Sequence, residues 1–193
     1  KSGSALIGRA VGEEYADASV ISFADTEVYP ANRVKITSIK TYGDYRIDLI
    51  INDLAKVFSF VGGPLKQVTS NMLEGGADSS YTSARLIESA SDGICVVIDG
   101  KEMFLGKKSY LRRYRFETPA DAKDDRFEEA GGSVMFVTMN DMLIAKVYVR
   151  YRISEQFNSL LRDMYRAGMC VGIKTVDPNI TTALLERTVR YKK

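Results

Sequence analysis

Carboxylate and hydroxyl side chains follow two apolar runs of this chain. Asp25 and Thr26 come after the first run, and Thr175 and Asp177 come after the second. A carboxylate at a strand end can act as a nucleophile, and a threonine with an aspartate can hold a phosphate-like anion. Two simpler interpretations stand beside these. Asp25 is a loop-capping residue, which we favour, and Asp177-Pro178 begins a helix.

The composition narrows the chemistry that such residues can perform. The 193 residues include no histidine, and the net charge is +2. Without histidine the chain lacks the commonest general base and the commonest transition-metal ligand. We therefore exclude a Ser-His-Asp or Cys-His enzyme and expect no metal site. Cys95 and Cys170 lie in apolar runs and are predicted to be buried and reduced.

The order of the predicted elements places one domain inside another. The apolar periodicity and the turn residues predict these elements: strands over 19–28 and 33–42, helices over 45–61 and 64–74, hairpins turning at 99–100 and 140–141, a helix opened by Thr118-Pro119, a helix over 155–167, a strand over 169–173 and a last helix from Asp177-Pro178. Mostly antiparallel elements thus separate the first strand from the closing βα units, as in an α+β domain inserted into a parallel α/β domain. We expect 19–28 and 169–174 to share one sheet, and the two connecting segments to lie side by side.

Several short motifs resemble, in order and spacing, those of the P-type cation-transporting ATPases, most closely the heavy-metal subgroup. The likeness covers nearly the whole chain. These stretches carry it: 3–10, similar to the segment that leaves the membrane; 18–30 (ASVISFADTEVYP), similar to the strand and loop with the phosphorylated aspartate; Gly63-Pro64-Leu65, similar to His-Pro-Leu; Ser91-Asp92-Gly93-Ile94, similar to Gly-x-Gly before a strand; 99–106 (DGKEMFLG), similar to a hairpin ending in Val-Gly; and 164–180, similar to the helix, strand and Thr-Gly-Asp loop.

The resemblance implies a specific domain organisation. An antiparallel-sheet, nucleotide-binding-like domain over 31–148 would be inserted into part of a haloacid-dehalogenase-like parallel α/β domain. That second domain would consist of 1–30 and 149–193. The resemblance also implies site residues: nucleotide contacts at Asp92, Gly93 and Gly106, and relics of the phosphate loops at Thr26, Thr175 and Asp177.

The departures from the family pattern fall on its chemistry. Ala24 stands at the nucleophile position, and Asp25 stands where the family has a lysine. Gly62 and Gly63 replace a glutamate and a histidine beside the adenine, and Ser91 replaces the first glycine of Gly-x-Gly. Because an aspartyl-phosphate needs a carboxylate nucleophile with magnesium and a cation to neutralise its oxygens, we expect no catalytic residue here.

The expected function follows from the resemblance and its losses. We expect a cytoplasmic-side region of a P-type-ATPase-like membrane protein, inactive and structural or regulatory, without cofactors. Its partners would be the transmembrane helices and remaining cytoplasmic domains of the same polypeptide. Two alternatives stay open: a functional pump with an atypical site, using ATP and magnesium, and a soluble interaction module. The basic and aromatic stretch 106–115 is interpreted as a solvated face, and no nucleic-acid partner is expected at this net charge.

Overall fold

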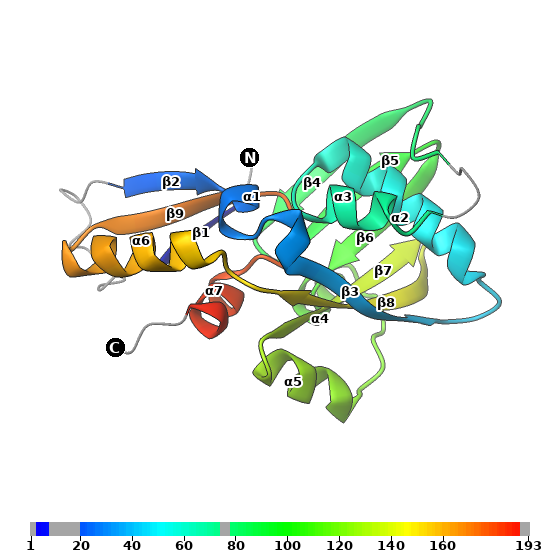
Figure 1. The fold of residues 1–193 in the computed structure, drawn as a ribbon. Coiled ribbons are helices and arrows are strands. Elements are labelled where there is room, and N and C mark those ends of the chain that lie inside the picture. The colour runs from blue at the N-terminus through cyan, green and yellow to red at the C-terminus, as the bar shows by residue number, and fades with distance from the viewer. Residues whose placement is uncertain (1–2, 8–19, 74–77, 190–193) are drawn as a thin grey trace.

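The strands of the chain form two separate sheets (Figure 1). The computed structural model describes residues 3–7, 20–73 and 78–189. The large sheet is antiparallel throughout, with six strands in this spatial order: β3 (Val34–Thr41), β8 (Met142–Tyr151), β7 (Gly132–Met139), β6 (Lys101–Gly106), β5 (Gly93–Ile98) and β4 (Ala84–Ala90). Asp99-Gly100 and Asn140-Asp141 turn two of its hairpins, as predicted.

The small sheet joins the two ends of the chain. β9 (Cys170–Thr175) lies between β1 (Gly3–Ile7) and β2 (Val20–Ala24). β2 runs parallel to β9 with Ala24 opposite Lys174, whereas β1 is antiparallel to it. The prediction that the first and last strand regions share a sheet is therefore confirmed. So is the fold class, because an antiparallel sheet interrupts a mixed α/β unit.

Seven helices are described, together with one 3-10 turn, η2 (Ala31–Arg33). They are α1 (Asp25–Val28), α2 (Ile47–Val61), α3 (Leu65–Ser70), α4 (Lys108–Arg113), α5 (Ala122–Glu129), α6 (Glu155–Arg166) and α7 (Thr182–Thr188). Among the described residues, no helix has the length and apolar character needed to cross a membrane.

Alternating side chains give the large sheet two cores. In β5 the side chains of Ile94 and Val96 join the cluster that holds α2, while Cys95 joins the cluster that holds α4. Because successive side chains of a strand point to opposite faces, α2 and α4 cover opposite sides of the sheet. Cys95 and Cys170 are both buried and free, as predicted.

Two connecting segments cross between the sheets side by side. The backbone N–H of Arg152 donates to the carbonyl of Arg33 over 2.9 Å, and the N–H of Ser154 donates to the carbonyl of Val28 over 3.0 Å. The predicted pairing of the connections is thus confirmed. The boundaries after 30 and 148 remain a prediction.

Four predicted element ends are wrong. The helix predicted over 64–74 already ends at Ser70. The first strand stops at Ala24, because the next four residues form the helical turn α1. The helix that Thr118-Pro119 was expected to open starts later, where Asp121 accepts a hydrogen bond from the N–H of Lys123. Asp177-Pro178 does not begin the last helix either, because Thr181 caps α7 through the N–H of Leu184.

Candidate functional site

The parallel pairing of β2 and β9 brings their carboxyl ends to one edge of the small sheet. There the hydroxyl of Thr175 donates to Oδ2 of Asp25 over 2.8 Å, and the N–H of Asp177 donates to the Thr175 hydroxyl over 3.0 Å. All three side chains are buried. The structure thus brings Thr175 and Asp177 together with Asp25 in a strand-end cluster, while the side chain of Thr26 is exposed and its backbone hydrogen-bonds to the Asp25 carboxylate.

Asp25 is buried at the start of α1. The carboxylate of Glu27 accepts the N–H of Ala24 over 2.7 Å and so closes the α1 turn. Burial raises the pKa of Asp25, and the hydrogen bond from Thr175 offsets part of that increase. Backbone hydrogen bonds from Asp25 and Thr26 also lower this pKa, so the interpretation of Asp25 as a loop cap stays a prediction.

Asp177 is held by neutral donors alone. The hydroxyl of Tyr151 donates to its Oδ2 over 2.6 Å, and the backbone and side-chain amides of Asn179 donate to its Oδ1 over 2.9 and 3.0 Å. Burial raises the pKa of Asp177 to about 6, against these hydrogen bonds that lower it. No ion pair joins Asp25 or Asp177 to a lysine or arginine of the described chain.

The α2–α3 turn lies directly against this cluster. A Cβ atom placed on Gly63 would lie 3.1 Å from Oδ2 of Asp25 and 3.9 Å from Cβ of Asp177. Gly63 also has φ +82°, a conformation that favours glycine. The strand-end cluster therefore meets the large-sheet unit here with no room for a phosphate group between Gly63 and Asp25.

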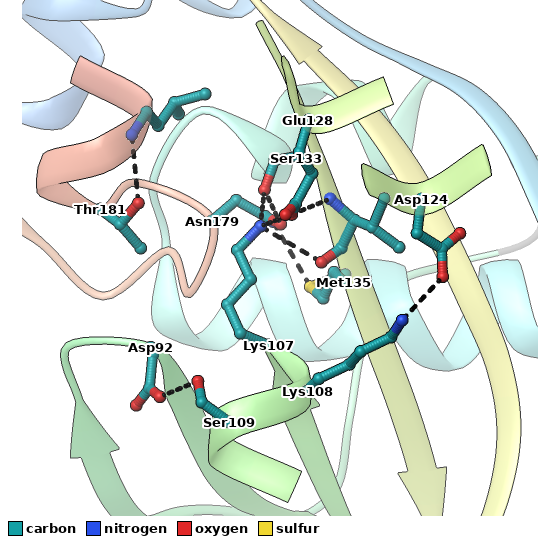
Figure 2. A network of polar contacts seen from close by, with 12 residues as sticks. Asp92, Lys107, Lys108, Ser109, Asp124, Glu128, Ser133, Met135, Asn179 and Thr181 are labelled. Carbon is teal, nitrogen blue, oxygen red and sulfur yellow. Dashed lines mark hydrogen bonds and ion pairs between the residues drawn. The ribbon is translucent and has the colours of Figure 1, made fainter. Parts of the chain in front are cut away.

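A chain of buried polar contacts continues from this cluster to Lys107 (Figure 2). Ser133 donates to Oδ1 of Asn179 over 2.8 Å, and it accepts a short hydrogen bond from Nζ of Lys107. The same ammonium donates to Oε1 of Glu128 over 2.7 Å and to the carbonyl of Val134 over 3.2 Å. Since an ammonium has three donors, all of those of Lys107 are in use. Burial lowers its pKa, and Glu128 opposes that shift.

The predicted nucleotide contacts lie at the β5–β6 pair, and a tyrosine fills the space above them. Gly93 and Gly106 are directly opposite each other. A Cβ on Gly93 would lie 2.0 Å from the Tyr110 ring, and one on Gly106 would lie 2.9 Å from it and 2.5 Å from the carbonyl oxygen of Asp92. Tyr110 is fully buried, and its hydroxyl donates to Glu88 over 2.8 Å. The missing side chains of this glycine pair thus make room for the protein's own ring.

Asp92 is engaged by the helix that carries Tyr110. Its Oδ2 accepts from the hydroxyl of Ser109 over 2.5 Å, as Figure 2 shows, and its Oδ1 accepts a short hydrogen bond from the guanidinium of Arg113. Asp92 therefore anchors α4 to the β4–β5 turn. The turn itself was expected from Asp92-Gly93.

A cavity of about 380 Å³ opens beside this network, between α4, α5 and α7. Asp124 lines it with an Oδ2 that has no hydrogen-bond donor in the described structure, 3.5 Å from Nζ of Lys108 (Figure 2). The other oxygen of Asp124 accepts from the buried ammonium of Lys146 and from the hydroxyl of Tyr148, each over 2.7 Å. Asp124 therefore serves mainly to fix α5 on the sheet.

The arrangement lacks the parts of a phosphoryl-transfer site. Ala24 has only a methyl group at the strand end, Asp25 is buried beneath Thr175 and Gly63, and the ammonium of Lys107 is fully used. The described residues contain no group of three or more acidic or cysteine side chains that could hold a metal ion. What the arrangement can do is fix the two sheets to each other through buried hydrogen bonds.

Sequence reasoning missed four residues of this network. Tyr110 lay in a stretch interpreted as a solvated face, Asn179 lay within the 164–180 motif without a role of its own, and neither Tyr151 nor Ser133 was named as a site residue. Tyr110 gave no indication of its burial, because basic residues surround it in the sequence. The others became visible through pairings between residues 26 to 46 positions apart.

The comparisons with known proteins give similar folds only. No family model matches the chain, and no curated protein matches it. Among solved structures, the N-domain of HMA6, a copper-transporting P-type ATPase, is 11% identical with a TM-score of 0.46, covering 61% of this chain and 99% of that one.

Larger solved structures also resemble the chain. A zinc-transporting PIB-type ATPase in the E2.Pi state is 16% identical with a TM-score of 0.48 over 90% of this chain. The catalytic domain of the CPx-ATPase CopB-B is 16% identical with a TM-score of 0.44 over 79% of it. The chain spans 28% of the first and 50% of the second. Likeness at this level says nothing about activity, so the function must rest on the residues of the chain itself.

Proposed function

We propose that this chain is a non-catalytic, cytoplasmic-side module of a P-type-ATPase-like membrane protein, and that its role is structural or regulatory. The motif order in the sequence supports the family. The geometry of the sites supports the loss of catalysis. The transmembrane helices and the other cytoplasmic domains of the same polypeptide are the proposed partners.

One observation carries the proposal: the Tyr110 ring lies over the Gly93–Gly106 pair. Backbone that approaches a ligand closely needs glycine, and here the closely approached group is a buried side chain of the same chain. Displacing this ring would expose a core residue of the α4 side and break its hydrogen bond to Glu88. A nucleotide would therefore have to compete with the packing of the protein itself.

The strand-end cluster supports the same conclusion. A pump with an atypical site would need Asp25 as its nucleophile. That carboxylate is buried, accepts a hydrogen bond from Thr175 and lies against Gly63 without a neighbouring cation. Phosphoryl transfer depends on positioning and on neutralising the phosphate oxygens, and this site offers neither.

The test uses isothermal titration calorimetry to measure the binding of ATP and, in a parallel experiment, of tripolyphosphate, both with magnesium. A separate assay measures phosphate release from ATP. Tripolyphosphate carries the charge of the nucleotide without its base. We expect ATP to bind no tighter than tripolyphosphate, and we expect no phosphate release from ATP above the buffer rate. Saturable, sub-millimolar ATP binding at least tenfold tighter than tripolyphosphate binding would overturn the proposal.

A further inference from the structure

A second cavity, of about 460 Å³, opens where the connecting segments cross between the sheets. Four arginines line it: Arg33, Arg150, Arg152 and Arg187. Arg33 ends η2, Arg150 and Arg152 lie at the end of β8 and just beyond it, and Arg187 belongs to α7. Arginines from three separate elements thus line one space, here called the arginine cavity.

The charge in this cavity is far out of proportion to that of the chain. The four arginines face a single acidic lining residue, Glu155, so the lining has an excess of three positive charges. The net charge of all 193 residues is only +2. Like charges gathered in one cavity repel one another, and an anion placed between them removes that repulsion.

The guanidinium groups are only partly engaged by the protein. Arg33 has a long ion pair of 3.6 Å with Glu155, whose side chain is 86% exposed. Arg150 donates to the carbonyl of Ala130 over 3.3 Å and lies 4.7 Å from the centre of the Phe127 ring. The side chains of Arg152 and Arg187 form no ion pair with any described residue. Since each guanidinium has five donors, most donors of the cavity remain available.

We propose that the arginine cavity binds a compact polyanion carrying at least two phosphate groups. A phosphate monoester carries about −1.5 to −2 at neutral pH, so two of them match the excess charge, whereas a single carboxylate does not. The planar guanidinium fork binds phosphate oxygens in pairs. The cavity volume also falls within the range of about 300 to 1,000 Å³ that is usual for small-molecule sites.

Because of its position between the sheets, the arginine cavity lets a bound ligand affect how the two sheets are held together. Arg33 and Arg152 belong to the two connecting segments, and the N–H of Arg152 already donates to the carbonyl of Arg33. Arg187 comes from α7, which contacts β1 of the small sheet, and Arg150 comes from the large sheet. A ligand bound by all four arginines therefore holds the two sheets in one relative orientation, and it stabilises the folded chain by mass action.

This inference does not depend on the proposed function, because Tyr110 and its glycine pair take no part in the arginine cavity. The triphosphate of ATP can enter the cavity without recognition of its base. Equal binding of ATP and tripolyphosphate supports both proposals, whereas preferential binding of ATP counts against the proposed function alone.

The experiment titrates sodium tripolyphosphate into the chain and into three single variants, with calorimetry and thermal unfolding as measurements. Arg152→Gln and Arg187→Gln each remove one charge from the arginine cavity. The matched control, Arg85→Gln, removes one exposed charge from the far edge strand β4. All three arginines are exposed, so the melting temperature without ligand should stay close to that of the wild type.

We expect at least tenfold weaker tripolyphosphate binding in each cavity variant and less than a twofold change in the control. Equal weakening in all three variants would show non-specific attraction and overturn the proposal, as would the absence of saturable binding to the wild type. Vesicles distinguish the source of the phosphate. Binding to phosphoinositide vesicles that tripolyphosphate competes away identifies a lipid headgroup, whereas binding of soluble tripolyphosphate alone identifies a free ligand.

Discussion

The Gly93–Gly106 face and the arginine cavity differ in whether the protein's own side chains fill the space and pair the charged groups. At the glycine pair the protein fills the space with Tyr110, and the adjoining Lys107 spends all three donors on its own chain. The arginine cavity, with a volume of about 460 Å³, is lined by four arginines and one exposed glutamate. Residue type alone does not distinguish the filled region from the open one, because glycine and basic residues occur in or beside both.

The difference teaches that a motif marks a place in the fold and not its accessibility. At the stretch that resembles a nucleotide loop, the Tyr110 ring fills the space above the glycine pair. The open, charged space lies instead at the crossing of the connections. The following predictions test that contrast, beginning with the change expected to cost most.

Tyr110→Ala should destabilise the chain by about 3–5 kcal/mol, because it leaves a large cavity in the α4-side core. Tyr110→Phe is the matched control and should cost about 1 kcal/mol, since it removes only the hydrogen bond to Glu88. Urea unfolding followed by circular dichroism measures both. A cost below about 1 kcal/mol for the alanine variant would mean that the ring does not close this face.

Asp177 should make the stability of the chain depend on pH. Its folded pKa of about 6 lies above the usual 3.8, so the folded state binds more protons than the unfolded state between these values. The free energy of unfolding therefore falls as pH rises through that window, by about 3 kcal/mol from this group. Asp177→Asn keeps the donors of Asn179 paired and does not titrate.

The measurement is denaturant unfolding of the wild type and Asp177→Asn from pH 4 to pH 7.5. The stability of the wild type relative to the variant should decrease as pH rises from about 4 to about 6, and then level off. Subtracting the variant removes the contributions of carboxylates that do not interact with Asp177, and the remaining difference belongs to Asp177 together with its neighbour Asp25. If the difference in the free energy of unfolding is constant, or grows in favour of the wild type with pH, then Asp177 is not a buried carboxylate without an ion pair.

Gly63→Ala should cost more than the same change at Gly168. Both glycines have positive φ, +82° and +71°, so each variant pays about 1–2 kcal/mol for the left-handed backbone. Only the Cβ at 63 meets Asp25, at 3.1 Å, whereas nothing lies within 4 Å of the Cβ at 168. We expect the variant at 63 to be less stable by about a further 1 kcal/mol in urea unfolding. If the two variants lose the same free energy of unfolding, the α2–α3 turn does not lie in close contact with the strand-end cluster.

Ala24→Asp should not restore phosphorylation. The new carboxylate would lie beside two acidic residues, Glu27, which closes the α1 turn, and the buried Asp25, and the single lysine opposite it, Lys174, does not replace a magnesium site. We expect no acid-stable label from gamma-labelled ATP with magnesium in the full-length protein. Ala24→Asn serves as the blank. Hydroxylamine-sensitive label on the aspartate variant would show that only one residue of the site has been lost.

The overall fold was largely predictable because local patterns specify it. The spacing of apolar residues in α2, the turns at Asp99-Gly100 and Asn140-Asp141, and the closing βα order each depend on neighbouring residues. The helix start assigned to Asp177 failed for the opposite reason. Oδ1 of Asp177 does accept the N–H of Asn179, as at a helix start, but the helix begins only after Thr181. Oδ2 of Asp177 accepts from Tyr151, a residue 26 positions away that no local rule contains.

The candidate site was predictable only in its members at the strand ends. Parallel strands bring Thr175 close to Asp25, and the sequence indicated both residues. The burial of Tyr110 was not predictable from the basic residues around it, because burial depends on the shape of the opposite β5–β6 pair. The arginine cavity was missed since its arginines come from three separate places in the chain, around residues 33, 150–152 and 187.

The most direct test of the contrast between the closed and the open region is a residue-resolved titration. Amide correlation spectra of the 15N-labelled chain are recorded with increasing ATP and, separately, with tripolyphosphate. We predict that the signals of Gly93, Gly106 and Lys107 stay in place, while those of Gly131 and Arg152 move equally with both compounds. Shifts of Gly93 and Gly106 that ATP causes and tripolyphosphate does not would contradict the account.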